Sequence, residues 1–200
     1  MVEQQHPFAC VVLAAGAGTR YGEPKAGARL PSGERFLDAV VRVAADAGAR
    51  PVIAVVPPGF TIPGRARGVE NLEPESEQIT SIRLGVAALA NAPVEGALVW
   101  PVDHPFVLIE SVLAVADGYR RTQAPIVIPT YDGRRGHPAF FARDTWPDLM
   151  TVASGGARAV VRAYASQVHE LPVPDPGVVL DIDTRSDMPP GGWRATDALS

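Results

Sequence analysis

The residues with the clearest chemical potential lie in a glycine-rich segment, LAAGAGTRYGEPK, at positions 13–25. Its glycines let the backbone approach a ligand closely and turn N–H groups toward phosphate oxygens. Arg20 and Lys25 add two cations that can meet several phosphate charges. Lys25 is the only lysine in a chain whose 17 other basic residues are arginine, which indicates that an ammonium is needed there. We therefore expect a triphosphate-binding loop, although the spacing fits neither a P-loop nor the dinucleotide fingerprint; the alternative is an ordinary glycine-rich turn.

A second informative segment is LVWPVDHPFV, at positions 98–107, in which Asp103 follows an apolar run. An aspartate at the end of a buried strand would lie beside a bound triphosphate. Mg²⁺ is commonly held by one or two carboxylates together with phosphate oxygens and water. We therefore expect Asp103 to bind Mg²⁺, although it could instead cap the following segment. His104 fits a structural role better than a direct chemical one.

A second carboxylate could come from DIDTRSD, at positions 181–187. Asp181 and Asp183 are two positions apart, so both point the same way from an extended segment. One of them could complete a metal site, and a capping cluster around Thr184 or Asp187 explains the same residues equally well.

A fourth segment, DGRRGHPAFF at positions 132–141, precedes an apolar strand. Arg134, Arg135 and His137 could bind an anionic second substrate. The alternative is a solvated hairpin turn, for which Asp132-Gly133 is a strong signal. No GxSxG, HExxH or CxxC pattern offers a different chemistry.

Alternating strands and helices position these segments. Continuous apolar runs predict buried strands, and apolar residues at helical spacing predict helices between them. The expected strands span 8–15, 51–56, 97–102, 126–129 and 168–173, and the expected helices span 34–48, 79–89, 109–121 and 155–166. This order predicts a mostly parallel sheet covered on both faces, with ligands beyond the C-terminal ends of its strands.

Composition limits the class of protein. With 200 residues, we expect one domain, 1–200, with a core at about 8–187 and a C-terminal tail at 188–200. A net charge of −4 argues against a nucleic-acid partner, and no apolar run reaches the roughly 18 residues that a membrane-spanning helix needs. The lone Cys10 lies in an apolar run, which favours a core position and a reducing, cytoplasmic location.

The segments together resemble a known family. LAAGAGTRYGEPK is similar to its LAAGxSxRxGxPK opening, and EQITSIRLGVAAL at 77–89 is similar to its central serine motif. The other matches are the metal motif DxP at Asp103-His104-Pro105, RRGHPxxF at 134–141, GAR at 156–158 and the DIDT tail at 181–184. From Val11 to about Asp187, the chain resembles the MobA-like nucleotidyltransferases, and within them the molybdenum cofactor cytidylyltransferases.

The resemblance implies a single-domain, three-layer, Rossmann-like α/β fold. It also implies an enzyme that transfers a nucleotidyl group from a triphosphate, here CTP, to a phosphorylated small-molecule acceptor, molybdopterin. It implies catalytic roles for Arg20, Lys25 and Asp103, with Mg²⁺ on Asp103 and Asp183. The implied nucleotide-binding residues are Leu13, Ala14, Ala15, Gly16, Ala17, Gly18, Thr19, Arg20, Lys25, Thr80 and Ser81, and the implied acceptor-binding residues are Arg134, Arg135, Gly136 and His137.

The sequence also departs from the family pattern. Glu77 replaces a glycine, Ser154 replaces an aspartate, and Arg185-Ser186 replaces Pro-Glu. Two alternatives therefore stand beside the main expectation: a nucleotidyltransferase for another phosphorylated metabolite, and a protein that binds a nucleotide or cofactor without turnover. The oligomeric state does not follow from the sequence.

Overall fold

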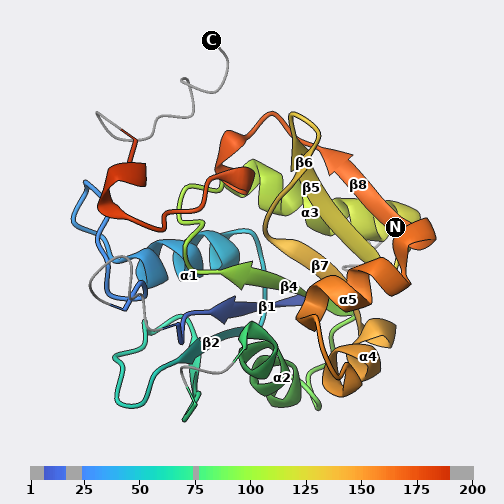
Figure 1. Cartoon of the computed structure of the whole chain (residues 1–200), viewed down its shortest axis with the longest axis horizontal. Helices are drawn as coiled ribbons and strands as arrows, with labels where there is room; N and C mark the ends of the chain where they lie inside the picture. The colour runs from blue at the N-terminus through green and yellow to red at the C-terminus, as the bar shows by residue number, and fades with distance from the viewer. Residues whose placement is uncertain (1–6, 17–23, 74–76, 190–200) are drawn as a thin grey trace, which may run out of the picture.

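The strands form one eight-stranded mixed sheet in the order β3-β2-β1-β4-β7-β5-β6, with β8 paired to β5 (Figure 1). The computed structural model describes residues 7–16, 24–73 and 77–189. The strands are β1 (Phe8–Leu13), β2 (Val52–Val56), β3 (Arg67–Glu70), β4 (Gly96–Pro101), β5 (Ile126–Tyr131), β6 (Arg134–Arg135), β7 (Ala139–Ala142) and β8 (Val168–Pro172). The pairs β1–β2, β1–β4, β2–β3 and β5–β8 are parallel, whereas β7 runs antiparallel to β4 and β5.

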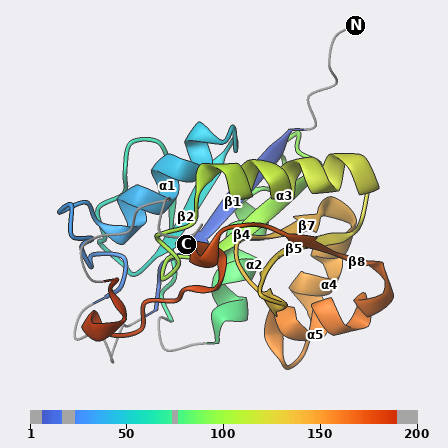
Figure 2. The ribbon, with the colours of Figure 1, turned by 90° about the horizontal axis from the view of Figure 1, so that it is seen from above.

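Helices cover both faces of this sheet. They are α1 (Phe36–Asp46), α2 (Gln78–Ala88), α3 (Ile109–Thr122), α4 (Trp146–Thr151) and α5 (Gly156–Ala163). Seen from above, α1 and α3 lie on one side of the sheet and α2, α4 and α5 on the other (Figure 2). The chain is therefore a three-layer α/β protein with a mostly parallel sheet, as the sequence predicts. Within the part of the chain that the structure describes, no helix is long and apolar enough to cross a membrane.

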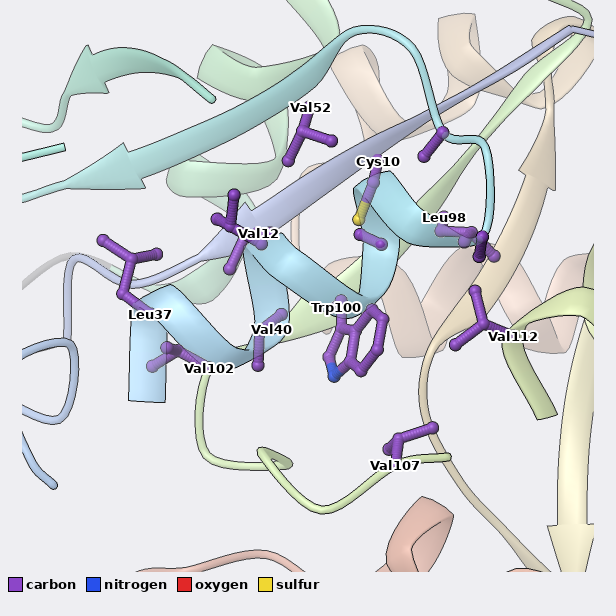
Figure 3. Close-up of a cluster of buried hydrophobic side chains, with 14 of the residues drawn as sticks. Cys10, Val12, Leu37, Val40, Val52, Leu98, Trp100, Val102, Val107 and Val112 are labelled. Atoms are coloured by element: carbon purple, nitrogen blue, oxygen red, sulfur yellow. The ribbon is translucent and has the colours of Figure 1, made fainter. Parts of the chain in front are cut away.

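Successive side chains of β1 point alternately into two hydrophobic cores, one on each face of the sheet. Cys10 and Val12 pack into the core under α1 and α3, where Trp100 is fully buried (Figure 3). Val11 and Leu13 point to the opposite core, under α2. A strand buried on both faces must be apolar at every position, which explains its continuous apolar run.

Helix α2 lies close to β1 because Gly85 faces the strand. A Cβ at position 85 would lie 2.2 Å from Cγ1 of Val11, so a side chain would push the helix away. This contact lets the C-terminal half of α2 pack directly on the middle of β1.

The predicted elements are present within a few residues of their expected bounds. Two elements, β3 and the short α4, have no counterpart among the expected strands and helices. The Asp132-Gly133 signal is confirmed as the β5–β6 hairpin turn, with φ of 48° and 71° at the two residues. The expected tail at 188–200 lies almost entirely outside the described residues.

Candidate active site

The start of the predicted phosphate loop emerges from the middle of the sheet. Leu13, Ala14 and Ala15 are buried, and Gly16 is exposed. The Ala14 N–H donates to the Val55 carbonyl at 2.8 Å, which ties the start of the loop to β2. No atom of the described residues would lie within 4 Å of a Cβ at Gly16, so these residues leave the space there open. The predicted loop residues Ala17, Gly18, Thr19 and Arg20 lie outside the described residues.

Three predicted residues from distant parts of the chain meet at one point. Lys25 Nζ lies 3.0 Å from Oδ2 of Asp103 and also donates to Oδ1 of Asp183. Lys25 ends the glycine-rich loop, Asp103 follows β4 and Asp183 follows β8. The C-terminal segment reaches this point by running back from β8 toward α1 (Figures 1 and 2). The predicted catalytic lysine and the two predicted metal ligands thus form one cluster.

The charges in this cluster stabilise one another. Burial alone would raise the pKa of Asp103, but hydrogen bonding to His104 and the charges of His104 and Lys25 outweigh burial and hold that pKa well below its usual range. Burial alone would lower the pKa of Lys25, and the two carboxylates more than compensate, so its pKa is raised. The ammonium and the Asp103 carboxylate are therefore both charged near neutral pH.

Backbone contacts fix the two carboxylates. The Ile182 N–H donates to the Asp103 carbonyl at 2.8 Å, and the Ile182 side chain is fully buried in the core. His104 Nδ1 lies 3.0 Å from Oδ1 of Asp103, and the His104 carbonyl accepts from the Trp100 indole. His104 is thus a buried residue that also orients Asp103. The capping alternative for the tail is confirmed too, because Asp187 and Thr184 form a capping box.

The donor set suits a hard divalent cation that also binds phosphate. Two carboxylates already face a single cationic group, and Mg²⁺ takes one or two protein carboxylates with phosphate oxygens and water as its other ligands. Within the described residues, no group of three or more His, Cys, Asp or Glu side chains forms a complete protein-only metal site. The cluster therefore fits a metal that arrives with a phosphate ligand.

A pocket of about 690 Å³ opens beside Asp103. It lies between the starts of α2 and α5 and the β6–β7 connection. Its polar lining comprises Glu77, Gln78, Asp103, His104, Arg135, His137, Arg158, Arg162 and Asp181. Isoleucine, valine and phenylalanine side chains form much of the remaining wall. A volume of this size suits a small-molecule substrate.

The RRGHP segment contributes to this pocket unevenly. Arg135, Gly136 and His137 line it, whereas Arg134 is exposed and is not part of the lining. Arg135 is bound to Glu170 of β8, with Nη2 and Oε1 2.6 Å apart. A Cβ at Gly136 would lie 2.3 Å from the Val178 carbonyl oxygen, so glycine is required for this close passage.

His137 is held in its neutral form. Burial, helped by the neighbouring His104 ring at 4.8 Å between centroids, lowers the pKa of His137 to about 4. Its Nδ1 is buried and has no hydrogen-bond partner among the described residues. His137 therefore contributes no positive charge to the pocket at neutral pH.

The pocket contains residues to which the sequence analysis gave no site role. Arg158 and Arg162 lie one turn apart on α5, and Glu77 precedes α2 without a side-chain capping bond. The GAR match already marked Arg158, and its spacing of four from Arg162 could have identified the pair.

The predicted Thr80 and Ser81 do not line this pocket. Ser81 is buried, and its hydroxyl accepts a hydrogen bond from Asn71 at 3.1 Å. Asn71, at the end of β3, also accepts from the Glu73 N–H. Because β3 was not fully anticipated, nothing in the sequence drew attention to Asn71.

Comparison with known proteins places the chain in a family. The family model for the MobA-like NTP transferase domain matches residues 10–169. The chain belongs to this family. It is a nucleotidyltransferase of MobA type.

Several proteins similar to this chain come from mycobacteria. The chain is 33% identical over 156 residues to a Mycobacterium tuberculosis H37Rv protein named "Probable molybdenum cofactor guanylyltransferase", covering 76% of each. The crystal structure of Rv0371c from Mycobacterium tuberculosis H37Rv superposes with a TM-score of 0.75 at 27% identity, covering 90% of this chain and 95% of that one. A complex of Rv0371c with manganese gives a TM-score of 0.68 at 26% identity, with the same coverage.

Proposed function

We propose that this MobA-like nucleotidyltransferase transfers a guanylyl group from GTP to a phosphate of the molybdenum cofactor, with release of pyrophosphate. The observation that carries the proposal is the juxtaposition of the Lys25–Asp103–Asp183 cluster with a substrate-sized pocket. The relatives named as guanylyltransferases support the base and the acceptor.

The proposed reaction is an in-line displacement at the α-phosphorus. A phosphate oxygen of the acceptor forms a bond to this phosphorus as its bond to the bridging oxygen of pyrophosphate breaks. The start of the glycine-rich loop would hold the triphosphate, and Lys25 would meet the negative charge that grows on the leaving pyrophosphate. The protein thus acts by positioning and fixed charges.

Asp103 and Asp183 would hold Mg²⁺ in this proposal. The bound ion would supply charge neutralisation to the phosphate oxygens. Two facts support a divalent metal: the charged Asp103 carboxylate faces the same point as Asp183, and Rv0371c has been crystallised with manganese.

The pocket beside Asp103 would hold the acceptor. Neither Arg158 nor Arg162 has an ion-pair partner among the described residues, so both can meet anionic groups of the acceptor. Apolar side chains of the wall would cover a flat ring system.

CTP remains the second candidate donor, because the RRGHP and DIDT segments at 134–138 and 181–184 resemble the cytidylyl branch. Pyrophosphate release should be measured with GTP, CTP, ATP and UTP against molybdenum cofactor as acceptor. A higher kcat/KM for GTP supports the proposal. A higher value for CTP would make the chain a cytidylyltransferase, and no release with any triphosphate would contradict the proposed turnover.

The acceptor pocket has its own test. Arg162→Gln should raise the KM for the acceptor while leaving the KM for the triphosphate within about twofold. Arg121→Gln, on the exposed end of α3, is a matched control for loss of one guanidinium. Equal effects of both variants on the acceptor KM would remove Arg162 from the acceptor site.

A further inference from the structure

Lys25 occupies the position between the two carboxylates that a metal would need. Its ammonium contacts Oδ2 of Asp103 and Oδ1 of Asp183. The other oxygen of Asp103 is engaged by His104. A divalent ion cannot bind the same carboxylate oxygens while the ammonium remains bound to them. Both cations need the same oxygen lone pairs, and two positive charges held so close together repel each other.

The lysine can leave this position without unfolding its surroundings. The backbone turn around it is fixed by hydrogen bonds from Gly27 N to Pro24 O and from Ala28 N to Lys25 O. Ala26 and Ala28, which belong to this turn, are fully buried. The charge, by contrast, sits at the end of a flexible four-carbon side chain. The ammonium can therefore move to a new anionic partner while its backbone stays in place.

A bound triphosphate would be such a partner. In the proposed function it would lie on the loop that ends at Lys25, and its several negative charges would offer more than the two carboxylates do. Once the ammonium contacts phosphate oxygens, it no longer occupies the oxygens of Asp103 and Asp183 that it contacts in the free protein. The metal then gains carboxylate and phosphate ligands together, which is the set that Mg²⁺ prefers.

We propose that Lys25 and the divalent metal compete for Asp103 and Asp183, so that the free protein binds metal weakly and the metal enters with the triphosphate. This inference rests on the proposed metal-dependent function and adds an order of binding to it. By linkage, triphosphate and metal must each raise the affinity for the other.

The test measures Mn²⁺ binding to the nucleotide-free protein, with the electron paramagnetic resonance signal of free Mn²⁺ as the readout. Removing the competing charge with Lys25→Met should tighten Mn²⁺ binding by roughly 5- to 150-fold, the usual range of such coupling. Lys25→Arg keeps a cation between the carboxylates and should bind Mn²⁺ as weakly as the wild type. Arg121→Met, at the far end of α3, controls for the same change in net charge.

Unchanged or weaker Mn²⁺ binding in Lys25→Met, with an intact circular dichroism spectrum, would overturn the proposal. If Lys25→Met does not fold, Lys25→Gln serves the same purpose. Asp103→Asn should abolish the gain when combined with either variant, and a gain that persists would place the metal elsewhere. Because these measurements involve no turnover, tighter Mn²⁺ binding without pyrophosphate release would leave this inference standing while the proposed function failed.

Discussion

Replacing Lys25 by alanine should separate catalysis from folding. The ammonium would face charge that develops on the leaving pyrophosphate. Losing one preorganised group of this kind raises the barrier by about 2.7–4 kcal/mol. We therefore expect the kcat of Lys25→Ala to fall by about 100- to 1000-fold.

The effect of Lys25→Ala on stability should be much smaller. The side chains of Lys25, Asp103 and Asp183 are 15%, 25% and 39% exposed, so solvent screens both ion pairs. Pairs of this kind contribute about 0–1 kcal/mol each, and the variant leaves two carboxylates facing each other. A loss of about 1–2 kcal/mol is expected, which corresponds to roughly 2–8 °C in the Tm of a chain of this length.

The assay pairs steady-state pyrophosphate release with thermal unfolding on the same samples. Lys25→Arg is the control, because it keeps the positive charge and should keep most of the stability. If Lys25→Ala retained nearly normal kcat but lost many degrees of Tm, the lysine would be a structural clamp, and its assignment to the triphosphate would be wrong.

Three further variants or treatments test other parts of the structure. Asp103→Asn should abolish Mg²⁺-dependent pyrophosphate release while the circular dichroism spectrum stays unchanged; a wild type with equal triphosphate affinity in EDTA and in Mg²⁺ would count against this role. Gly136→Ala should lower stability by about 1–3 kcal/mol in urea unfolding and raise the acceptor KM, because its Cβ would overlap the Val178 carbonyl; unchanged stability would mean that the β6–β7 connection can shift freely. Burial raises the pKa of the Cys10 thiol, so iodoacetamide should label it only after denaturation; rapid labelling of the native protein would contradict its core position.

The fold was largely predictable because most strands are buried on both faces. Such strands are continuous apolar runs, as in 8–13 and 96–101, and they are visible without any tertiary information. Strand β3 lacks this signal: RGVE is short and mostly exposed, and among the described strands it pairs with β2 alone. Helix α4 has six residues, too few to show a helical repeat, and contains Pro147 at its start.

The Lys25–Asp103–Asp183 cluster was predictable because a sheet rule and a local pattern coincide. The C-terminal ends of neighbouring parallel strands meet at one edge, which brings the loop after β1 close to Asp103. Asp183 joins them because Ile182 is buried and bonded to the Asp103 backbone. The alternation Asp-Ile-Asp alone did not distinguish the two aspartates, and the family resemblance favoured Asp183. In the structure Asp183 meets Lys25, whereas Asp181 lines the pocket.

The ionisation of His137 could not be predicted from the sequence. A histidine beside two arginines reads as part of a cationic cluster. In the folded protein its ring is buried against His104, and the cost of burying a charge keeps it neutral. The pKa of a histidine depends on what packs around it, which is a property of the tertiary structure.

The location of the RRGHP segment bears on the choice between GTP and CTP. This segment supported the expectation of a cytidylyltransferase, yet Arg135, Gly136 and His137 line the pocket proposed for the acceptor. Guanylyl- and cytidylyltransferases of the molybdenum cofactor share that acceptor, so a motif that contacts the acceptor can be common to both. If the pocket holds the acceptor, the motif therefore indicates which acceptor supplies the attacking phosphate. It indicates little about which base is transferred. The similarity to guanylyltransferases and the presence of RRGHP are then compatible, and base selection must come from groups outside this pocket.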